Sequence, residues 1–211
     1  QEHINLKTGL DGKSVTAMAS DGERIWISTS ADGFFVYDIS SRMLYPQVNL
    51  SLEKDGVKFS AKEMIAGDNG TIWAAITSLN QIIECKWKNG KAEIIGRYFT
   101  MSPLYIAKGS DGSIWTGTIS NTLSVLRPGE KNFHYIKVFG DNYTFIPALL
   151  PIEDGGIIVA GMMNPLVIVY PDGTITKLPI DDEEFKSCIK YVEFVPTALA
   201  IDKKGNLWIG T

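Results

Sequence analysis

Short apolar runs alternate with tight-turn residues along most of the chain. The apolar segment 103–109 leads into Asp111–Gly112, a second run covers 113–118, and a third, 122–127, ends before Pro128–Gly129. Runs of β-branched and aromatic residues separated by Asp-Gly, Asn-Gly and Pro-Gly turns are typical of successive hairpins. The pattern therefore predicts an all-β protein built from short antiparallel strands.

A longer repeat is superimposed on this pattern. The repeated phrases are "SDGERIWIST" (20–29), "GDNGTIWAAI" (67–76), "GSDGSIWTGT" (109–118), "EDGGIIVAG" (153–161) and "DKKGNLWIGT" (202–211). Their anchors are separated by 47, 42, 43 and 50 residues and are Trp26, Trp73, Trp115, Ile158 and Trp208. A period in the forties with several short strands per unit is typical of β-propeller blades. We predict a partial β-propeller of four-stranded antiparallel blades at 14–50, 59–99, 104–139 and 146–180, with a fifth blade begun at 197–211.

The repeated tryptophan has a structural explanation. It lies on the second strand, just after a tight turn, where a large flat side chain can pack between neighbouring blades. We expect these tryptophans to be core residues rather than a cage around a ligand. Ile158 fills the same position with less apolar area, which predicts a thinner interface after the fourth blade.

Residues 181–194 interrupt the alternation. Phe185, Cys188, Ile189 and Val192 fall at helical spacing, with Asp181 and Asp182 available as caps, which predicts a short helix inserted between the fourth and fifth blades. The acidic run 181–184 lacks the oxygen-ligand spacing of a calcium loop and indicates a solvated helix start.

Composition narrows the function classes. The 24 acidic and 20 basic residues give a net charge of −4, which argues against nucleic-acid binding and against contact with an anionic membrane surface. No apolar stretch approaches the ~20 residues needed to span a bilayer. Cys85 and Cys188 are too far apart for a zinc-site spacing and too few for a disulfide scaffold, so we expect two unpaired, half-buried thiols.

The first and last units are similar to a known repeat family. The first unit carries Gly9–Leu10, Val15, Asp21–Gly22, Ile25–Thr29, Asp32–Gly33 and Tyr37–Asp38; the last carries Leu199, Ile201, Asp202, Gly205 and Leu207–Thr211. This pattern resembles the two-component regulator propeller repeats, which build the periplasmic sensor region of hybrid two-component systems in gut Bacteroidetes. The chain departs from the family pattern at Ala74–Ile76 and at Ile158.

The resemblance implies seven-bladed rings placed ahead of a membrane crossing and a histidine kinase. Seven blades need ~315 residues at ~45 residues per blade, so residues 1–211 are expected to hold about four and a half blades. Residues 1–8 are expected to be the closing strand of the last blade. The resemblance also implies a periplasmic location, as the extracytoplasmic part of an inner-membrane protein, and we expect the full-length protein to form a homodimer.

The leading functional hypothesis is a sensor segment that binds a glycan-type ligand such as an oligosaccharide. Asp32, Asn80, Asn121 and Asn164 recur six or seven positions after each anchor and are candidates for hydrogen bonds to sugar hydroxyls. Tyr105 and Tyr143 are candidates for stacking on a sugar ring. The alternatives are that Asn and Asp simply favour tight turns and that both tyrosines pack at the propeller rim.

Two other functions stay open. A propeller lyase or glycosidase would need convergent catalytic groups, but His3 and His134 lie far apart, and the four arginines occupy unrelated positions in the repeat. We therefore expect no catalytic residues, metal or cofactor in this segment. A protein-interaction scaffold is the other alternative, since fold alone does not exclude it.

Overall fold

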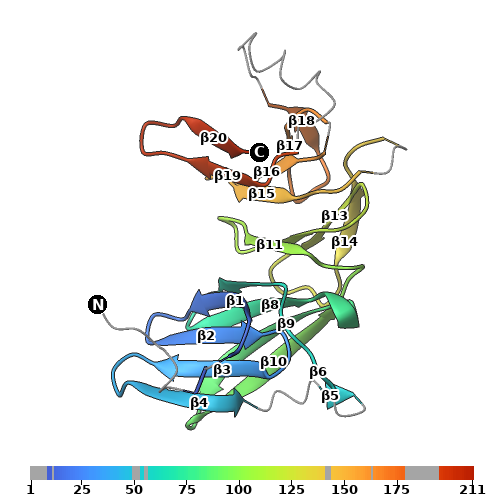
Figure 1. The fold of residues 1–211 in the computed structure, drawn as a ribbon. Helices are drawn as coiled ribbons and strands as arrows, with labels where there is room; N and C mark the ends of the chain where they lie inside the picture. The colour runs from blue at the N-terminus through green and yellow to red at the C-terminus, as the bar shows by residue number, and fades with distance from the viewer. Residues whose placement is uncertain are drawn as a thin grey trace. The chain divides into compact units, whose positions relative to one another are not determined.

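The computed structural model describes residues 9–10, 12–48, 53–54, 57–140, 144–162, 164–178 and 195–211 (Figure 1). The chain divides into two compact units, residues 1–99 (unit 1) and 100–211 (unit 2). The predicted closing strand at 1–8, the predicted helix at 181–194, Tyr143 and Cys188 lie outside the described residues.

Unit 1 contains two four-stranded antiparallel sheets, blades 1 and 2. Blade 1 consists of β1 (Val15–Ser20), β2 (Arg24–Thr29), β3 (Gly33–Asp38) and β4 (Met43–Val48). Blade 2 consists of β7 (Glu63–Ala66), β8 (Thr71–Ile76), β9 (Gln81–Lys88) and β10 (Lys91–Phe99), with the 3-10 helix η2 (Thr77–Leu79) between β8 and β9. A small hairpin, β5 (Glu53–Lys54) and β6 (Val57–Lys58), lies between the two blades in the sequence.

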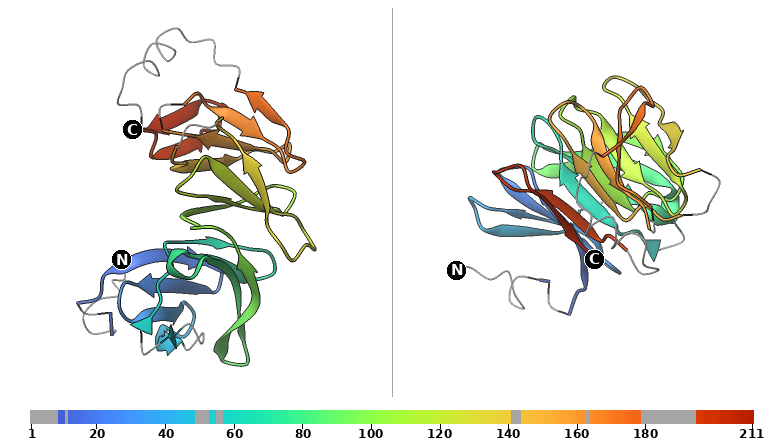
Figure 2. Two further views of the ribbon diagram at one scale, coloured as in Figure 1. Left: turned by 90° about the vertical axis from the view of Figure 1, so that its right-hand side faces the viewer. Right: turned by 90° about the horizontal axis from the view of Figure 1, so that it is seen from above.

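Unit 2 contains blades 3 and 4 and a two-stranded hairpin, blade 5. Blade 3 consists of β11 (Tyr105–Lys108), β12 (Ile114–Gly117), β13 (Thr122–Leu126) and β14 (His134–Lys137). Blade 4 consists of β15 (Ala148–Pro151), β16 (Ile157–Ala160), β17 (Val167–Val169) and β18 (Ile175–Lys177), and blade 5 of β19 (Ala198–Ile201) and β20 (Leu207–Gly210). Figure 2 shows blade 4 in orange between blades 3 and 5, with β15 beside both β11 and β19. The predicted four-stranded antiparallel sheets are confirmed.

The Asp–Gly–Trp phrase is held together by one carboxylate in blades 1 and 5. Asp21 Oδ1 accepts the backbone N–H groups of Glu23 and Arg24, and its Oδ2 accepts the Trp26 indole N–H at 2.9 Å. In blade 5, Asp202 Oδ1 accepts two turn N–H groups and Oδ2 accepts the Trp208 indole N–H at 3.1 Å. The aspartate therefore caps the turn and orients the tryptophan at the same time.

This bond depends on the length of the turn. The aspartate precedes the tryptophan by five residues in blade 1 and by six in blade 5, but only by four in blade 3. There, Ser113 donates to both oxygens of Asp111, and the buried Trp115 Nε1 has no hydrogen-bond partner among the described residues. Blade 4 has the same short spacing and no tryptophan, and its Asp154 Oδ2 accepts the Tyr170 hydroxyl instead, at 2.9 Å.

Titration of Asp202 should be visible at Trp208. Hydrogen bonds from the Asn206 side chain, the Asn206 N–H and the Trp208 indole lower the pKa of Asp202 to about 2. An unpaired Asp has a pKa of about 4. The stability that these hydrogen bonds contribute to the folded state is therefore fully present above that pH and is lost as the pH falls through about 2. We expect the ¹H–¹⁵N signal of the Trp208 indole to shift over this window.

The same molecule provides a control for that titration. Trp115 Nε1 donates to no carboxylate, so its indole signal should stay constant while the Trp208 signal moves. Asp202→Asn should abolish the shift at Trp208. A midpoint near 4 would contradict the structure.

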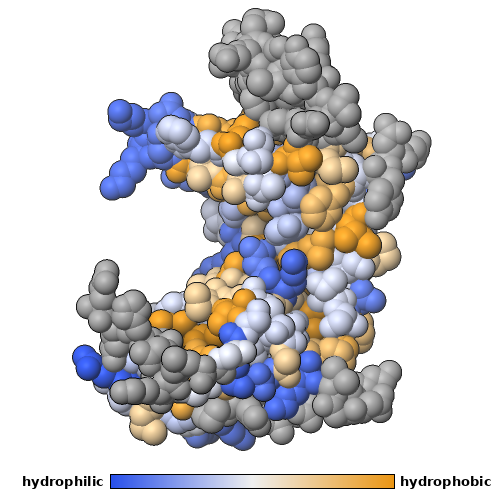
Figure 3. Space-filling view, viewed as in Figure 1, coloured by the Kyte–Doolittle hydropathy of each residue, from blue (hydrophilic) through white to orange (hydrophobic). Residues whose placement is uncertain are grey.

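The hairpin tip that carries Asp202 is hydrophilic and appears at the upper left of Figure 3.

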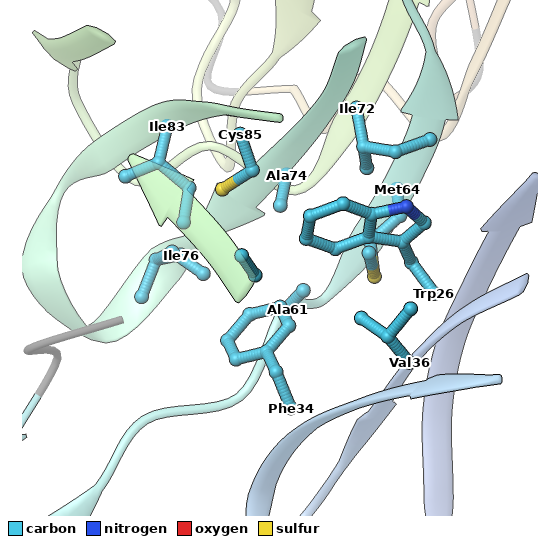
Figure 4. Packing of buried hydrophobic residues seen from close by; sticks show 11 residues of the cluster. Trp26, Phe34, Val36, Ala61, Met64, Ile72, Ala74, Ile76, Ile83 and Cys85 are labelled. Atoms are coloured by element: carbon cyan, nitrogen blue, oxygen red, sulfur yellow. The ribbon is translucent and has the colours of Figure 1, made fainter. Parts of the chain in front are cut away.

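Trp26 lies at the interface of blades 1 and 2. Its side chain is fully buried, and Figure 4 shows it next to Met64 and Ile72 of blade 2 and Val36 of blade 1. The other buried members of this cluster are Phe34, Ala61, Ala74, Ile76, Ile83, Cys85 and Ala92. The prediction that the anchor tryptophan packs between blades is confirmed here.

Unit 2 repeats this arrangement between blades 3 and 4. Trp115 is fully buried against Ile157 and Val159 of blade 4. Among the described residues, the cluster around Ile158 has Ala148, Ala160 and Leu166 as its other buried members, with Leu199, Leu207 and Ile209 of blade 5 packed against it. The expected thinner interface remains a prediction. The prediction of a buried anchor is wrong for Trp208, which is 64% exposed, because among the described strands β20 pairs with β19 alone.

Candidate ligand-binding face

The innermost strand of each blade starts at the end where the second strand stops. Val15 pairs with Thr29 in blade 1, and Tyr105 pairs with Gly117 in blade 3. The turn between the second and third strands therefore lies beside the segment leading into each blade. We call this end of each blade its loop face. In blades 1 to 4 it includes residues 29–33, 76–81, 117–122 and 160–167.

Asp32 and Asn80 lie on the loop faces of unit 1, and both have local structural contacts. Asp32 Oδ2 is 2.8 Å from Lys13 Nζ, and the Asp32 N–H donates to Thr29 Oγ1. Asn80 has a φ of 52°, a left-handed conformation that Asn tolerates well, and its N–H donates to the Thr77 carbonyl where η2 ends. These contacts fit the turn interpretation; a ligand contact at either residue remains a prediction.

Asn121 and Asn164 occupy equivalent turns in blades 3 and 4. Asn121 Nδ2 donates to the Phe139 and Gly140 carbonyls, in the segment that follows β14. Asn164 Nδ2 donates to Thr144 Oγ1 at 3.1 Å and to the carbonyl of Met162 at 2.8 Å. The amide N–H groups therefore anchor the loops, and the amide oxygen is the atom of each side chain best placed to accept a bond from a ligand.

Two threonines organise these turns and were missed by the sequence argument. Thr29 Oγ1 donates to the Gly33 carbonyl, and Thr118 Oγ1 donates to the Thr122 carbonyl at 2.8 Å. Each hydroxyl also accepts a backbone N–H from inside its turn. The signal was present in the sequence, since a threonine ends the "WIST" and "WTGT" phrases three residues after the tryptophan.

An aromatic pair lies on the loop face of unit 2. Tyr105, at the start of β11, and Phe145, which precedes β15, have ring centroids 6.0 Å apart at an interplanar angle of 67°. Both side chains are half-buried. Phe145 was missed because nothing local distinguishes it from other apolar residues. Only the packing of β11 beside β15 brings it next to Tyr105. The other aromatic candidate, Tyr143, lies outside the described residues.

A pocket of about 300 Å³ opens on unit 1, where β1 of blade 1 meets the segment leading into β7. It is lined by Thr16, Ser60, Ala61, Lys62, Thr77 and Ser78. Sequence reasoning did not find it, because its walls come from three segments that are far apart in the chain.

Groups suited to catalysis are dispersed in the described part of the chain. His134 lies on the outer strand β14, with Nε2 2.9 Å from Glu130. The Arg24 and Arg127 guanidinium groups each pair with nearby carboxylates. Burial raises the pKa of the Cys85 thiol to about 12; the expected half-buried thiol is fully buried and unreactive at neutral pH.

Metal ligands and membrane-spanning segments were also sought. Among the described residues, no group of three or more His, Cys, Asp or Glu side chains is arranged to hold a metal ion. No helix in the same residues has the length and apolar character needed to cross a bilayer.

Comparison with known proteins identifies the repeat. Residues 193–211 match the model of the family described as two component regulator propeller. The resemblance drawn from the residue pattern is thereby confirmed, on the repeat that ends in Leu207–Thr211. A search of curated proteins returned no match.

Solved structures share the fold. The extracellular domain of a putative hybrid two-component system from B. thetaiotaomicron has a TM-score of 0.66 at 19% identity, over 94% of this chain and 26% of that one. A second such domain gives 0.65 at 16% identity, over 93% and 25%. Virginiamycin B lyase from Staphylococcus aureus gives 0.69 at 14% identity, over 93% and 62%.

These likenesses establish the fold and leave the activity open. The chain spans about a quarter of the extracellular domains and about three fifths of the lyase. At identities below 20%, sheets and topology are comparable, whereas individual site residues are not. The predicted β-propeller class is confirmed, and it is the fold found in extracellular regions of hybrid two-component systems.

Proposed function

We propose that this chain is the ligand-binding part of an extracytoplasmic sensor in a two-component signalling protein, and that it binds a glycan-type ligand. The observation that carries the proposal is the two-component regulator propeller repeat at 193–211 in a chain of propeller fold. The segment itself is non-catalytic in this proposal, and its output is histidine-kinase signalling by the longer protein. That protein is periplasmic on its sensing side and dimeric.

The loop face of unit 2 supports a sugar as the ligand. Half-exposed aromatic rings offer apolar faces to the C–H side of a pyranose, while amide oxygens accept hydrogen bonds from its hydroxyls. Tyr105 and Phe145 supply the rings, and Asn121 and Asn164 supply the amides. All four residues lie at the loop ends of neighbouring blades in one unit.

Tyr105→Ala should weaken oligosaccharide binding about tenfold or more, since an aromatic stacking partner contributes about 1–3 kcal/mol. Isothermal titration of the 211-residue chain against a glycan panel measures this effect. The control is Tyr135→Ala: Tyr135 is 51% exposed on the outer strand β14, and its loss should leave the affinity unchanged.

Two results would count against the proposal. Absence of heat across the glycan panel would exclude a glycan as the ligand. Equal losses of affinity for Tyr105→Ala and Tyr135→Ala would exclude the loop face as the binding site. Asn121→Ala is a poorer test, because its amide also anchors the Phe139–Gly140 segment and its loss would disturb the loop.

A further inference from the structure

The pocket of unit 1 has walls fixed by hydrogen bonds. Ser28, fully buried on β2, accepts the Thr16 hydroxyl at 3.0 Å and the Ala61 N–H at 2.8 Å. The Ser28 hydroxyl oxygen thus links β1 to the segment that leads into β7, and these two segments form walls of the pocket. The Lys62 N–H donates to the Ala75 carbonyl at 2.8 Å, which holds the lysine backbone against β8. The cavity therefore exists before any ligand binds, which lowers the ordering cost of binding.

The residues that line the pocket combine hydroxyl-bearing side chains with one positive charge. Thr16, Ser60, Thr77 and Ser78 carry hydroxyl groups, of which that of Thr16 already donates to Ser28, and Lys62 carries an ammonium group. Among the described residues, no acidic side chain lines the pocket and no carboxylate forms an ion pair with Lys62. Hydroxyls donate to and accept from the hydroxyls of a ligand, whereas an ammonium group with three donors favours an oxyanion.

The size of the pocket restricts the ligand further. About 300 Å³ is at the lower end of the range for small-molecule sites, which is about 300–1,000 Å³. Such a volume accommodates one sugar ring. An acid without hydroxyl groups would offer no partner to the Ser60 and Ser78 hydroxyls.

We propose that this pocket is a second binding site, specific for a monosaccharide-sized ligand that carries an oxyanion such as a carboxylate or sulfate group. Lys62 pairs with the oxyanion, and the hydroxyls of Ser60 and Ser78 bind the ring hydroxyls. The site lies in unit 1, whereas Tyr105 and Phe145 lie in unit 2, so either site can fail without the other.

The test is a ¹H–¹⁵N titration of the 211-residue chain with glucuronate, glucose and inorganic sulfate in parallel. Glucuronate should shift the amide signals of Ala61, Lys62 and Ser78, and glucose should bind at least tenfold more weakly. Lys62→Gln should weaken glucuronate binding about tenfold or more, as expected for loss of a charge-assisted contact.

Matched variants separate this site from the rest of the surface. Lys88→Gln removes a lysine that is likewise exposed, at the β9–β10 hairpin, the opposite end of blade 2, and should leave the affinity for glucuronate within twofold. Tyr105→Ala should leave glucuronate binding unchanged. Equal binding of glucose and glucuronate, no effect of Lys62→Gln, or sulfate binding as tightly as glucuronate would each overturn the proposal.

Discussion

Trp26→Ala is expected to lower the free energy of unfolding of unit 1 by about 3–5 kcal/mol, the usual cost of truncating a buried aromatic residue. The Trp26 ring is fully buried and joins blade 1 to blade 2. Its loss leaves a cavity lined by residues of both sheets and leaves Asp21 Oδ2 without its indole donor. Folded domains are stable by only about 5–15 kcal/mol. This single change should therefore leave unit 1 with only a small free energy of unfolding.

Trp208→Ala is the matched control for this experiment. It removes the same side chain at the same position of the repeat, but Trp208 is 64% exposed. Its cost should be about 1 kcal/mol or less. Urea unfolding followed by hydrogen exchange of amides in β2 and β8 reports unit 1 separately from unit 2. Equal losses of protection in the two variants would show that Trp26 does not hold the blades together.

Gly161→Ala is expected to destabilise unit 2 by about 2–3 kcal/mol, at the upper end of the usual cost of overpacking. A Cβ atom at residue 161 would overlap Phe139 Cε2 and come within 2.8 Å of Phe139 Cζ. Phe139 is itself buried in the cluster of Trp115 and cannot turn away without disturbing it. The backbone of Gly161 is not in the left-handed region, so the cost arises from steric overlap alone.

A double-mutant cycle tests this explanation. Phe139→Leu makes space beside residue 161, so Gly161→Ala should cost less in that background, with a coupling energy of about 1 kcal/mol or more. Thermal unfolding of the two single variants and the double variant measures the coupling. Additive effects would mean that Gly161 is required for a reason other than its contact with Phe139.

Much of the fold could be predicted from the sequence because its signals are local. The turn aspartates, the glycines that follow them and the alternating apolar runs act within about ten residues, and they predict hairpins wherever they occur. The repeat period then groups those hairpins into blades. The role of Asp21 and Asp202 as indole acceptors follows the same local logic, since five or six residues separate each aspartate from its tryptophan.

The candidate site was less predictable because its contacts are long-range. Asn121 and Asn164 were found from their spacing, but their amide N–H groups turned out to anchor the adjoining loops. Phe145 lies 40 residues beyond Tyr105 and meets it only because β11 and β15 are neighbouring inner strands. The pattern of residues along the chain does not show which strands of different blades lie side by side.

The sequence by itself determined the all-β class, the repeat of four-stranded blades and the resemblance of residues 193–211 to the two-component regulator propeller family. These properties depend on turn chemistry and side-chain alternation, which adjacent residues specify. Tertiary structure decided which residues at the same position of the repeat are buried. Trp26 and Trp208 occupy the same repeat position, yet one is fully buried and the other 64% exposed, because burial requires a facing sheet. It also created the pocket of Lys62, whose walls meet only when blade 1 packs against blade 2.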